Sequence, residues 1–349
     1  MIERIVENQL IAALACGFTR SPMQINRLHE ADAEIIQLPG DGDALLAVTT
    51  DSVVEEIASG LYADPYLIGW MTVTVNMSDL AAVGANPIGL LVSEILPKNI
   101  PEAFLSKLQQ GIQDACSIYG THVLGGDTNF GEQLMMSGCA IGLISGGKHL
   151  TRIGARAGDI LYSSGKLGAG NAYAVQHLTS SGNSSDLRIA YRPTARLKEG
   201  QLLRRFASSC MDSSDGFIST VDQLMRLNTI GFEIDERWTD ALEPTAKQLA
   251  LECGIPFWLL LAGQHGEFEL VFTVPAKAES AFRQTAAQDG WAPLRIGRVI
   301  DEPVIELPLD GRRISLDTAR IRNLLPESNG DIQRYLRSLL QIDVEIRTE

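Results

Sequence analysis

The sequence NMSDLAAVGANP, residues 76–87, follows the apolar run WMTVTVN at 70–76 and leads into a second apolar run, IGLLVSEIL at 88–96. The first run is predicted as a strand, or as the start of a helix, that ends at Asp79. The second is predicted as a strand that Pro97 closes. Asp79 stands directly before LAAVGA, so a helix cap is one interpretation of it. A short acidic side chain at the end of a rigid element is also where a scaffold presents a ligand group.

An apolar run that ends in small polar residues and an aspartate recurs along the chain. The further cases are Gly40-Asp41-Gly42-Asp43, Thr49-Thr50-Asp51, Gly125-Gly126-Asp127-Thr128 and Met211-Asp212-Ser213-Ser214-Asp215-Gly216. Asp carboxylates suit Mg²⁺, and crowded carboxylates repel one another unless a cation lies between them. Because Mg²⁺ usually binds one or two carboxylates plus substrate phosphates, the set predicts several ions around a polyphosphate. For any single site, a turn or a helix cap is the competing interpretation.

The standard nucleotide-binding motifs are absent from the sequence. Residues 163–168 (SSGKLG) contain Gly-Lys, but a P-loop needs Gly at 160 and Ser or Thr at 167, where the chain has Ile160 and Leu167. Gly168-Ala169-Gly170 lacks the third glycine of a dinucleotide fingerprint. A polyphosphate would therefore have to be held by metal ions and loop amides.

The length and the irregular alternation of elements predict a two-domain α+β protein. A chain of 349 residues favours two domains over one, and we expect the boundary near Thr151, giving domains 1–150 and 151–349. We expect strands at 44–50, 88–96, 135–144, 159–163, 231–235, 268–274 and 293–299. We expect helices near the N-terminus and at 101–119, 168–179, 216–227, 240–253, 276–289 and 331–341.

The amino-acid composition argues against nucleic acid and membranes as binding partners. The net charge is −14, from 43 acidic and 29 basic residues, which disfavours nucleic acid. No apolar run approaches the roughly 20 residues that span a bilayer, so no membrane association is expected. The five cysteines, odd in number and without CxxC spacing, indicate thiols in a reducing cytoplasm.

These residues together resemble a known family. NMSDLAAVGANP (76–87), GGDT (125–128), the run from Thr151 to Gly168, RPTAR (192–196) and DSSDGF (212–217) look like thiamine-monophosphate kinase. That family belongs to the PurM-like superfamily of aminoimidazole ribonucleotide synthetase. The resemblance implies two α+β domains, with the N-terminal domains paired in a homodimer that shares a β-barrel and the C-terminal domain an α/β sandwich.

The resemblance also implies roles for individual residues. Mg²⁺ bridging the phosphates of ATP would be bound by Asp41 or Asp43, and by Asp51, Asp79 and Asp127. Thr50 would accompany Asp51, and Gly125, Gly126 and Thr128 would lie against phosphate. Asp212 and Asp215 would complete the metal cluster and act in catalysis, with Ser214 near a phosphate and Arg152 as a further phosphate ligand. An oxygen of the acceptor's own phosphate would attack the γ-phosphate.

Three segments depart from the family pattern, and they leave the acceptor open. The usual GDD is Gly-Asp-Gly-Asp (40–43) here, and the run after Asp51 is SVVEEIASGLY, with no His. The usual GEDYEL is QHGEFEL at 264–270, with Glu267 where an Asp is expected. A kinase acting on thiamine monophosphate, an ATP-dependent synthetase or ligase that phosphorylates an amide or carboxylate oxygen, and a non-catalytic ATP-binding regulator all remain open.

Overall fold

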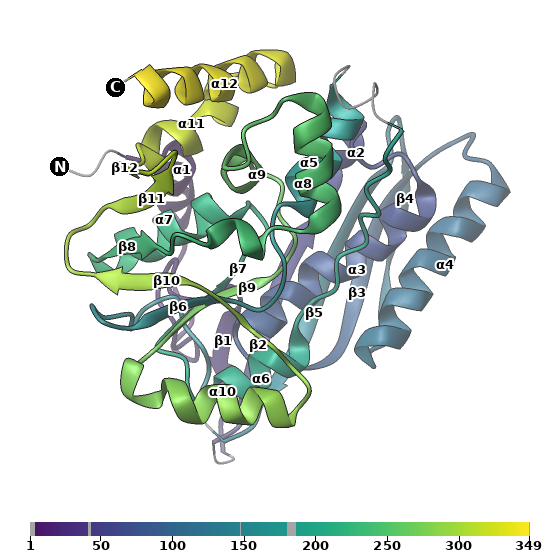
Figure 1. Ribbon diagram of the computed structural model, residues 1–349. Helices are drawn as coiled ribbons and strands as arrows, with labels where there is room; N and C mark the ends of the chain where they lie inside the picture. The colour runs from purple at the N-terminus through teal and green to yellow at the C-terminus, as the bar shows by residue number, and fades with distance from the viewer. Residues whose placement is uncertain (1–3, 41–42, 147, 180–185, 349) are drawn as a thin grey trace. The chain divides into compact units, whose positions relative to one another are not determined.

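The computed structural model describes residues 4–40, 43–146, 148–179 and 186–348. The chain divides into two compact units, each described by itself (Figure 1). Unit 2 comprises Pro22–Thr151 and Arg192–Arg205, and unit 1 comprises Met1–Ser21, Arg152–Tyr191 and Phe206–Glu349. Among the described residues, no helix is both long enough and apolar enough to cross a membrane.

Unit 2 is built on a five-stranded sheet in the order β1-β2-β5-β3-β4. The strands are β1 (Glu34–Gln37), β2 (Leu45–Ser52), β3 (Asn86–Pro97), β4 (Val123–Gly131) and β5 (Met135–Ile144), and the helices are α2 (Val54–Ala58), α3 (Pro65–Ala82), α4 (Glu102–Tyr119) and α6 (Leu197–Leu203). Neighbouring strands are antiparallel except β3 and β4, which are parallel. Alternate residues of β5 are buried, so this strand has one covered face and one more open face.

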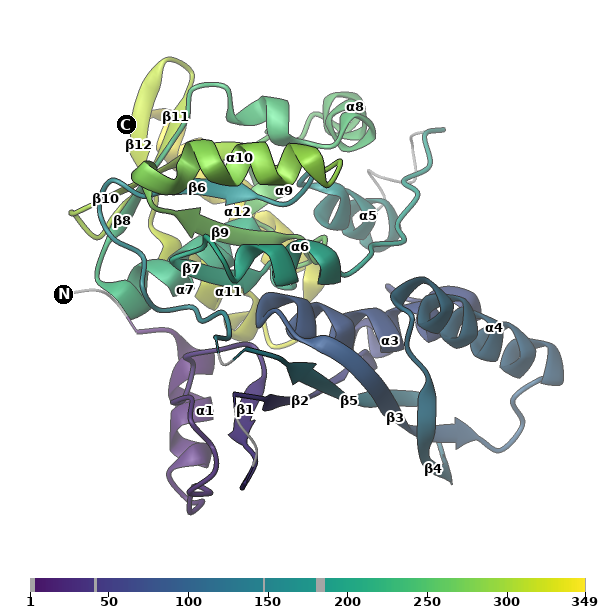
Figure 2. The same ribbon diagram turned by 90° about the horizontal axis from the view of Figure 1, so that it is seen from below.

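Helices α3 and α4 lie on the covered face of this sheet, as Figure 2 shows. Asp64 caps α3 by accepting a hydrogen bond from the Tyr66 amide, and Pro65 occupies its first turn. The two helices cross at glycines: a Cβ on Gly69 would lie 2.0 Å from the Leu108 carbonyl oxygen, and one on Gly111 would lie 2.1 Å from that of Tyr66. The two glycines therefore let the backbones of α3 and α4 approach closely at this crossing.

Two sequence expectations about aspartates are corrected here. The run at 70–76 is not a strand, because α3 is one continuous helix from Pro65 to Ala82 and Asp79 lies in its last turn rather than at a helix start. Gly125, Gly126 and Asp127 lie inside strand β4 rather than after a strand. Asp51 also lies inside a strand, one residue before β2 ends at Ser52.

Unit 1 contains a seven-stranded sheet in the order β12-β11-β8-β10-β6-β9-β7. Its strands are β6 (Ile160–Ser163), β7 (Ser209–Asp212), β8 (Gly231–Ile234), β9 (Leu270–Val274), β10 (Leu294–Ile300), β11 (Ile305–Leu309) and β12 (Arg312–Ser315). Its α-helices are α1 (Val6–Ala15), α5 (Ala169–Leu178), α7 (Phe217–Asn228), α8 (Pro244–Cys253), α9 (Leu259–Ala262), α10 (Glu279–Gln288), α11 (Thr318–Glu327) and α12 (Ile332–Thr348), and short 3₁₀ helices span Trp238–Ala241 and Ala276–Ala278.

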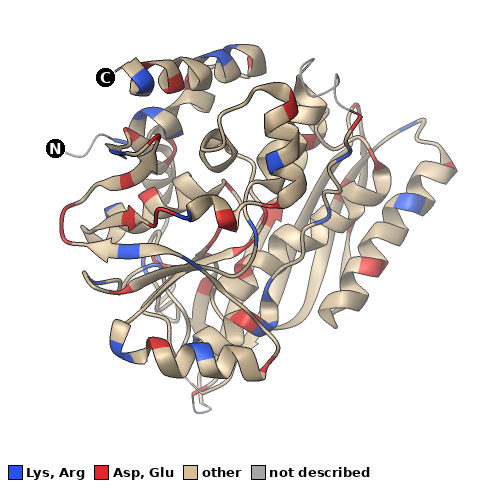
Figure 3. Cartoon of the chain, viewed as in Figure 1, with Lys and Arg blue, Asp and Glu red and all other residues tan. Residues whose placement is uncertain are grey.

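Helices α7 and α10 lie on opposite faces of this sheet (Figures 1 and 2). On the α10 side, Phe282 packs edge-on against Tyr162 and Phe272. On α10 and α12, acidic and basic residues are interspersed (Figure 3), and Arg347 of α12 pairs with Asp343 at 2.9 Å. The two mixed sheets with their helices confirm an α+β architecture.

Candidate metal and phosphate site

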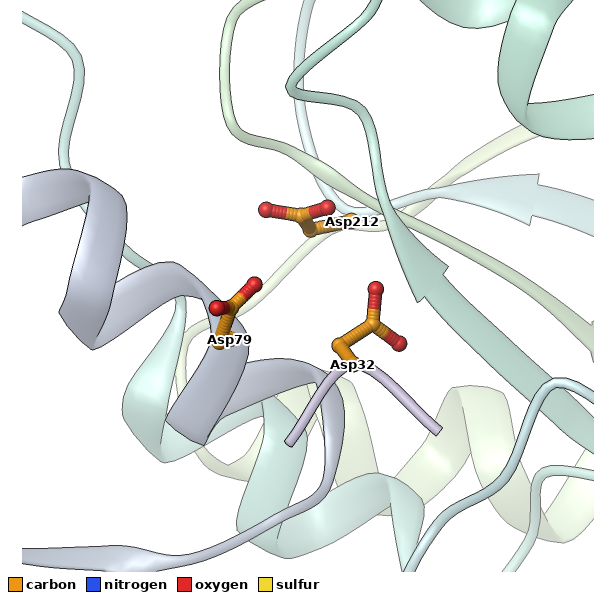
Figure 4. Close-up of side chains that lie close together, drawn as sticks. All are labelled: Asp32, Asp79 and Asp212. Carbon is orange, nitrogen blue, oxygen red and sulfur yellow. The ribbon is translucent and has the colours of Figure 1, made fainter. Parts of the chain in front are cut away.

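Two carboxylates meet in unit 2, from α3 and from the turn before β1. Carboxylate oxygens of Asp79 and Asp32 lie within 4.8 Å of each other, and both side chains are half-buried (Figure 4). The hydroxyl of Thr49 donates to Asp79 Oδ2 at 2.5 Å, which fixes the orientation of that carboxylate. Mg²⁺ binds oxygens at about 2.0–2.1 Å, so one ion between two ligands needs oxygens about 4 Å apart or less. A separation of up to 4.8 Å is close to this limit, so the two carboxylates are candidates to share one ion after a small side-chain adjustment.

Strand β2 places Asp51 on the same covered face as Thr49. Every second residue of a strand lies on one face, so Asp51 shares its face with Thr49, Ala47 and Leu45, all three of which are buried. Its backbone amide donates to Asn76 Oδ1 of α3 at 3.1 Å. Thr50 points to the opposite face and its hydroxyl donates to the Gly138 carbonyl at 2.8 Å. Asp51 is thus held beside α3, whereas Thr50 is not.

Strand β4 carries the glycine-rich motif at the other edge of the sheet. Gly126 pairs with Val92, and a Cβ at Gly126 would lie 1.9 Å from the Val92 carbonyl oxygen, so only glycine fits there. Asp127 pairs with Ser93, an exposed residue, and therefore lies on the open face. Asn129 donates to Asp127 at 2.6 Å, and Thr128 donates to Glu94 at 2.8 Å.

The register separates Asp51 from the Gly125–Thr128 motif. Asp51 pairs with Gly138, Gly138 with Val92, and Val92 with Gly126. Three strand spacings of 4.7–4.9 Å make about 14 Å across the sheet. A single cation cannot bind Asp51 and Asp127 of the same chain across that distance, so these two carboxylates would serve separate ions.

In unit 1, β7 ends at the DSSDG turn. Asp212, also drawn in Figure 4, is 2% exposed and accepts a hydrogen bond from the Ser214 hydroxyl at 3.2 Å. Asp215 is exposed in the turn that leads into α7. The Gly266 amide donates to the Ser214 carbonyl at 2.8 Å, and a Cβ on Gly266 would lie 1.5 Å from the Ser213 carbonyl. The segment 264–270 therefore supports this turn directly.

That supporting segment contains two titratable groups with displaced pKa values. Burial raises the pKa of Glu267 to about 8, and its Oε1 accepts from the amides of Gly168 at 2.7 Å and Gly170 at 3.1 Å. Because both amides donate to the same oxygen, Oε2 is left for a proton. Burial lowers the pKa of His265 to about 3, so this imidazole is neutral near pH 7.

Three predicted residues remain, namely Asp41, Asp43 and Arg152. Asp43 is exposed just before β2, and Asp41 falls outside the described residues. Arg152 is half-buried, and its carbonyl accepts a hydrogen bond from Asn228 at 2.9 Å. Sequence reasoning missed Asp32, Thr49 and Asn76. Asp32 stands before the short strand EIIQ, whereas the recurring motif has its aspartate after an apolar run.

Comparison with known proteins shows which families the chain is similar to. Residues 30–144 match the family model "AIR synthase related protein, N-terminal domain". The thiamine-monophosphate kinase of Escherichia coli strain K12 is 30% identical over 277 residues, which is 75% of this chain and 84% of that protein. The thiamine-monophosphate kinase of Pyrococcus horikoshii is 32% identical over 67% of this chain and 74% of its own length.

A solved structure shares the fold. The AaThiL complex with AMPPCP and TMP superimposes with a TM-score of 0.70 at 23% identity, over 89% of this chain and 96% of that one. This likeness supports the two-sheet architecture that the helices and strands define. With the sequence identity over most of both chains and the Asp32–Asp79 pair in the matched domain, the chain belongs to the thiamine-monophosphate kinase family.

Proposed function

We propose that this protein is a Mg²⁺-dependent kinase that transfers the γ-phosphoryl group of ATP to thiamine monophosphate, giving thiamine diphosphate. The family relationship supports the reaction. The observation that carries the metal dependence is the pair of carboxylates, Asp32 and Asp79, whose oxygens lie within 4.8 Å. The cytoplasmic location stays a prediction from the cysteine pattern.

The chain's part in the reaction is to bind and orient charge. Mg²⁺, when bound, neutralises negative charge on the phosphates and on the transferring group. Asp32 and Asp79 would hold one ion, with Asp51 on the same face of the sheet. Asp127 would hold a separate ion, and the amides of Gly125 and Gly126, in a strand that tolerates no Cβ at Gly126, would lie against phosphate. That Asp212 and Asp215 join this set stays a prediction.

A homodimer is part of the proposal. The open face and outer edge of the unit 2 sheet carry large apolar side chains that are 40–69% exposed in the single chain, namely Ile88, Leu91, Val123, Leu124, Phe130 and Met135. Exposed apolar groups gathered on one sheet mark an interaction surface. Within one chain this sheet ends at two edge strands, β1 and β4, so a shared barrel would require a second copy.

Product analysis tests the proposed reaction. The full chain would be incubated with ATP, Mg²⁺ and thiamine monophosphate, and thiamine diphosphate and ADP would be measured by chromatography. We expect the two products in equal amounts, and none after EDTA. Release of inorganic phosphate that requires an added amine would instead identify the ligase alternative. ATP binding without turnover on thiamine monophosphate or any other phosphorylated acceptor would identify a regulator.

A further inference from the structure

Strand β2 and helix α3 are joined by two hydrogen bonds, and in each of them β2 is the donor and a side chain of α3 is the acceptor. Thr49 of β2 donates its hydroxyl to the carboxylate of Asp79 on α3 at 2.5 Å. Asn76 of α3 accepts the backbone amide of Asp51 on β2 at 3.1 Å. Each bond ends on a residue that carries one of the proposed metal-binding carboxylates, so each carboxylate residue is tied to the element that bears the other.

Asn76 is suited to this place by both ends of its side-chain amide. It is 0% exposed. While its oxygen accepts from Asp51, its Nδ2 donates to the Thr72 carbonyl at 3.0 Å and approaches the Asp51 carbonyl at 3.4 Å. An aspartate could accept but not donate, and an apolar residue could do neither, which would leave buried backbone groups without these bonds.

The neighbouring strand leaves room for the amide. Gly138 of β5 pairs with Asp51, and a Cβ at Gly138 would lie 2.4 Å from Asn76 Nδ2. The glycine therefore permits the helix side chain to reach the backbone of β2. Asn76 lies three residues before Asp79, so both side chains lie on the same side of α3. Asn76 therefore contacts β2 at Asp51, about one helical turn before Asp79.

We propose that Asn76 and Thr49 are positioning residues that together set the distance between the Asp51 and Asp79 carboxylates, and with it the affinity for a divalent cation. This inference rests on the proposed metal-dependent function. Neither side chain need touch the ion. Asn76 fixes where β2 presents Asp51, and Thr49 fixes which way Asp79 points.

The competing explanation is that these bonds only stabilise unit 2. Thr74 supplies the matched control, since it lies on the same helix, is likewise 0% exposed, and bonds Tyr119 at 2.9 Å instead of β2. Losing its hydroxyl in Thr74→Val removes a buried hydrogen bond of α3 but leaves both connections to β2. A general loss of stability would therefore affect Asn76 and Thr74 variants alike.

The test measures Mn²⁺ binding to the full chain by electron paramagnetic resonance of the free ion, with thermal unfolding recorded for every variant. We expect Asn76→Ala and Thr49→Val each to weaken Mn²⁺ binding about tenfold or more, and Thr74→Val to change it less than twofold. Thr49→Val replaces only a hydroxyl by a methyl group, so it keeps the test valid if Asn76→Ala does not fold. With Mg²⁺ at saturation, kcat should return toward the wild-type value.

The inference would be overturned if Thr74→Val weakened Mn²⁺ binding as much as the folded Asn76→Ala or Thr49→Val variants do. It would also be overturned if the folded Asn76→Ala and Thr49→Val variants bound Mn²⁺ with unchanged affinity. A wild-type chain that binds no Mn²⁺ would overturn it together with the metal site. A wild-type chain that binds Mn²⁺ but does not phosphorylate thiamine monophosphate would contradict only the proposed substrate, and the Mn²⁺ affinities of the variants would still decide the inference.

Discussion

At the scale of single residues, the metal site turns on which acidic side chain accompanies Asp79. The GDGD segment suggested Asp41 or Asp43, whereas the structure brings Asp32 within 4.8 Å of Asp79 and leaves Asp43 exposed. We expect Asp79→Asn and Asp32→Asn each to lower kcat by two orders of magnitude or more, because a neutral amide is a much poorer Mg²⁺ ligand. Asp43→Asn should change kcat less than threefold.

Steady-state rates at several Mg²⁺ concentrations, with circular dichroism to confirm folding, check this prediction. If Asp43→Asn were as inactive as Asp79→Asn while Asp32→Asn kept its activity, the assignment of Asp32 would be wrong. We expect Asp127→Asn to lower kcat as much as Asp79→Asn does, although the two residues would bind separate ions.

His265 gives a prediction about stability and pH. Burial lowers its pKa to about 3, while the unfolded chain's imidazole takes up a proton near pH 6.5. As the pH falls from 6.5 toward 3, protonation therefore favours the unfolded chain, and stability is lost over that window. His265→Phe keeps a ring to pack on Tyr191 but cannot titrate.

Thermal unfolding from pH 7.5 to 4 measures this effect. The melting temperature of the wild type should fall more steeply below pH 6.5 than that of His265→Phe, and the two slopes should agree above pH 7. Parallel curves across the whole range would show that His265 does not contribute to the acid sensitivity.

At the scale of elements, the sequence predicted most helices and strands but left α3 undecided, and the reason is physical. Fifteen of the 18 residues of α3 are buried, so the apolar-polar period of a surface helix is missing. The run Thr72–Val75 is β-branched, which favours a strand locally. Packing against α4 and the sheet decides for the helix. The motif thus identified Asp79 as a candidate ligand, but the sequence pattern did not predict that Asp79 lies in the last turn of a helix.

The α3–α4 crossing yields a prediction at the same scale. Gly111→Ala should destabilise the protein by about 2–4 kcal/mol, because a Cβ would lie 2.1 Å from the Tyr66 carbonyl oxygen and the helices would have to separate. Helix propensity alone predicts the opposite sign, a gain of about 1 kcal/mol. Gln110→Ala, at the exposed neighbouring position of α4, is the control. Urea unfolding measures the free energy of unfolding of each variant. A Gly111→Ala variant that is more stable than the wild type would refute the close crossing.

At the scale of the whole chain, the length and the irregular alternation of elements predicted two α+β parts, but local patterns could not show how the chain is shared between them. Arg192–Arg205 belongs with unit 2 although it follows a long segment of unit 1. The contacts that hold it are long-range: Trp70 donates to the Pro193 carbonyl at 2.8 Å, and Tyr119 accepts from the Ala195 amide at 3.0 Å. Partners more than 70 residues apart leave no periodic signal in a sequence.

The proposed dimer is tested on the open face of the unit 2 sheet. Leu91 of β3 is 41% exposed on that face, and a second copy covering it would desolvate any charge placed there. Leu91→Glu should therefore lower the mass measured by light scattering from about twice the 37.9 kDa of one chain to that of a single chain. Leu251→Glu, at a leucine of α8 that is 70% exposed in unit 1, should leave the mass unchanged. A wild-type mass of one chain would contradict the dimer, and a dimeric Leu91→Glu would place its interface elsewhere.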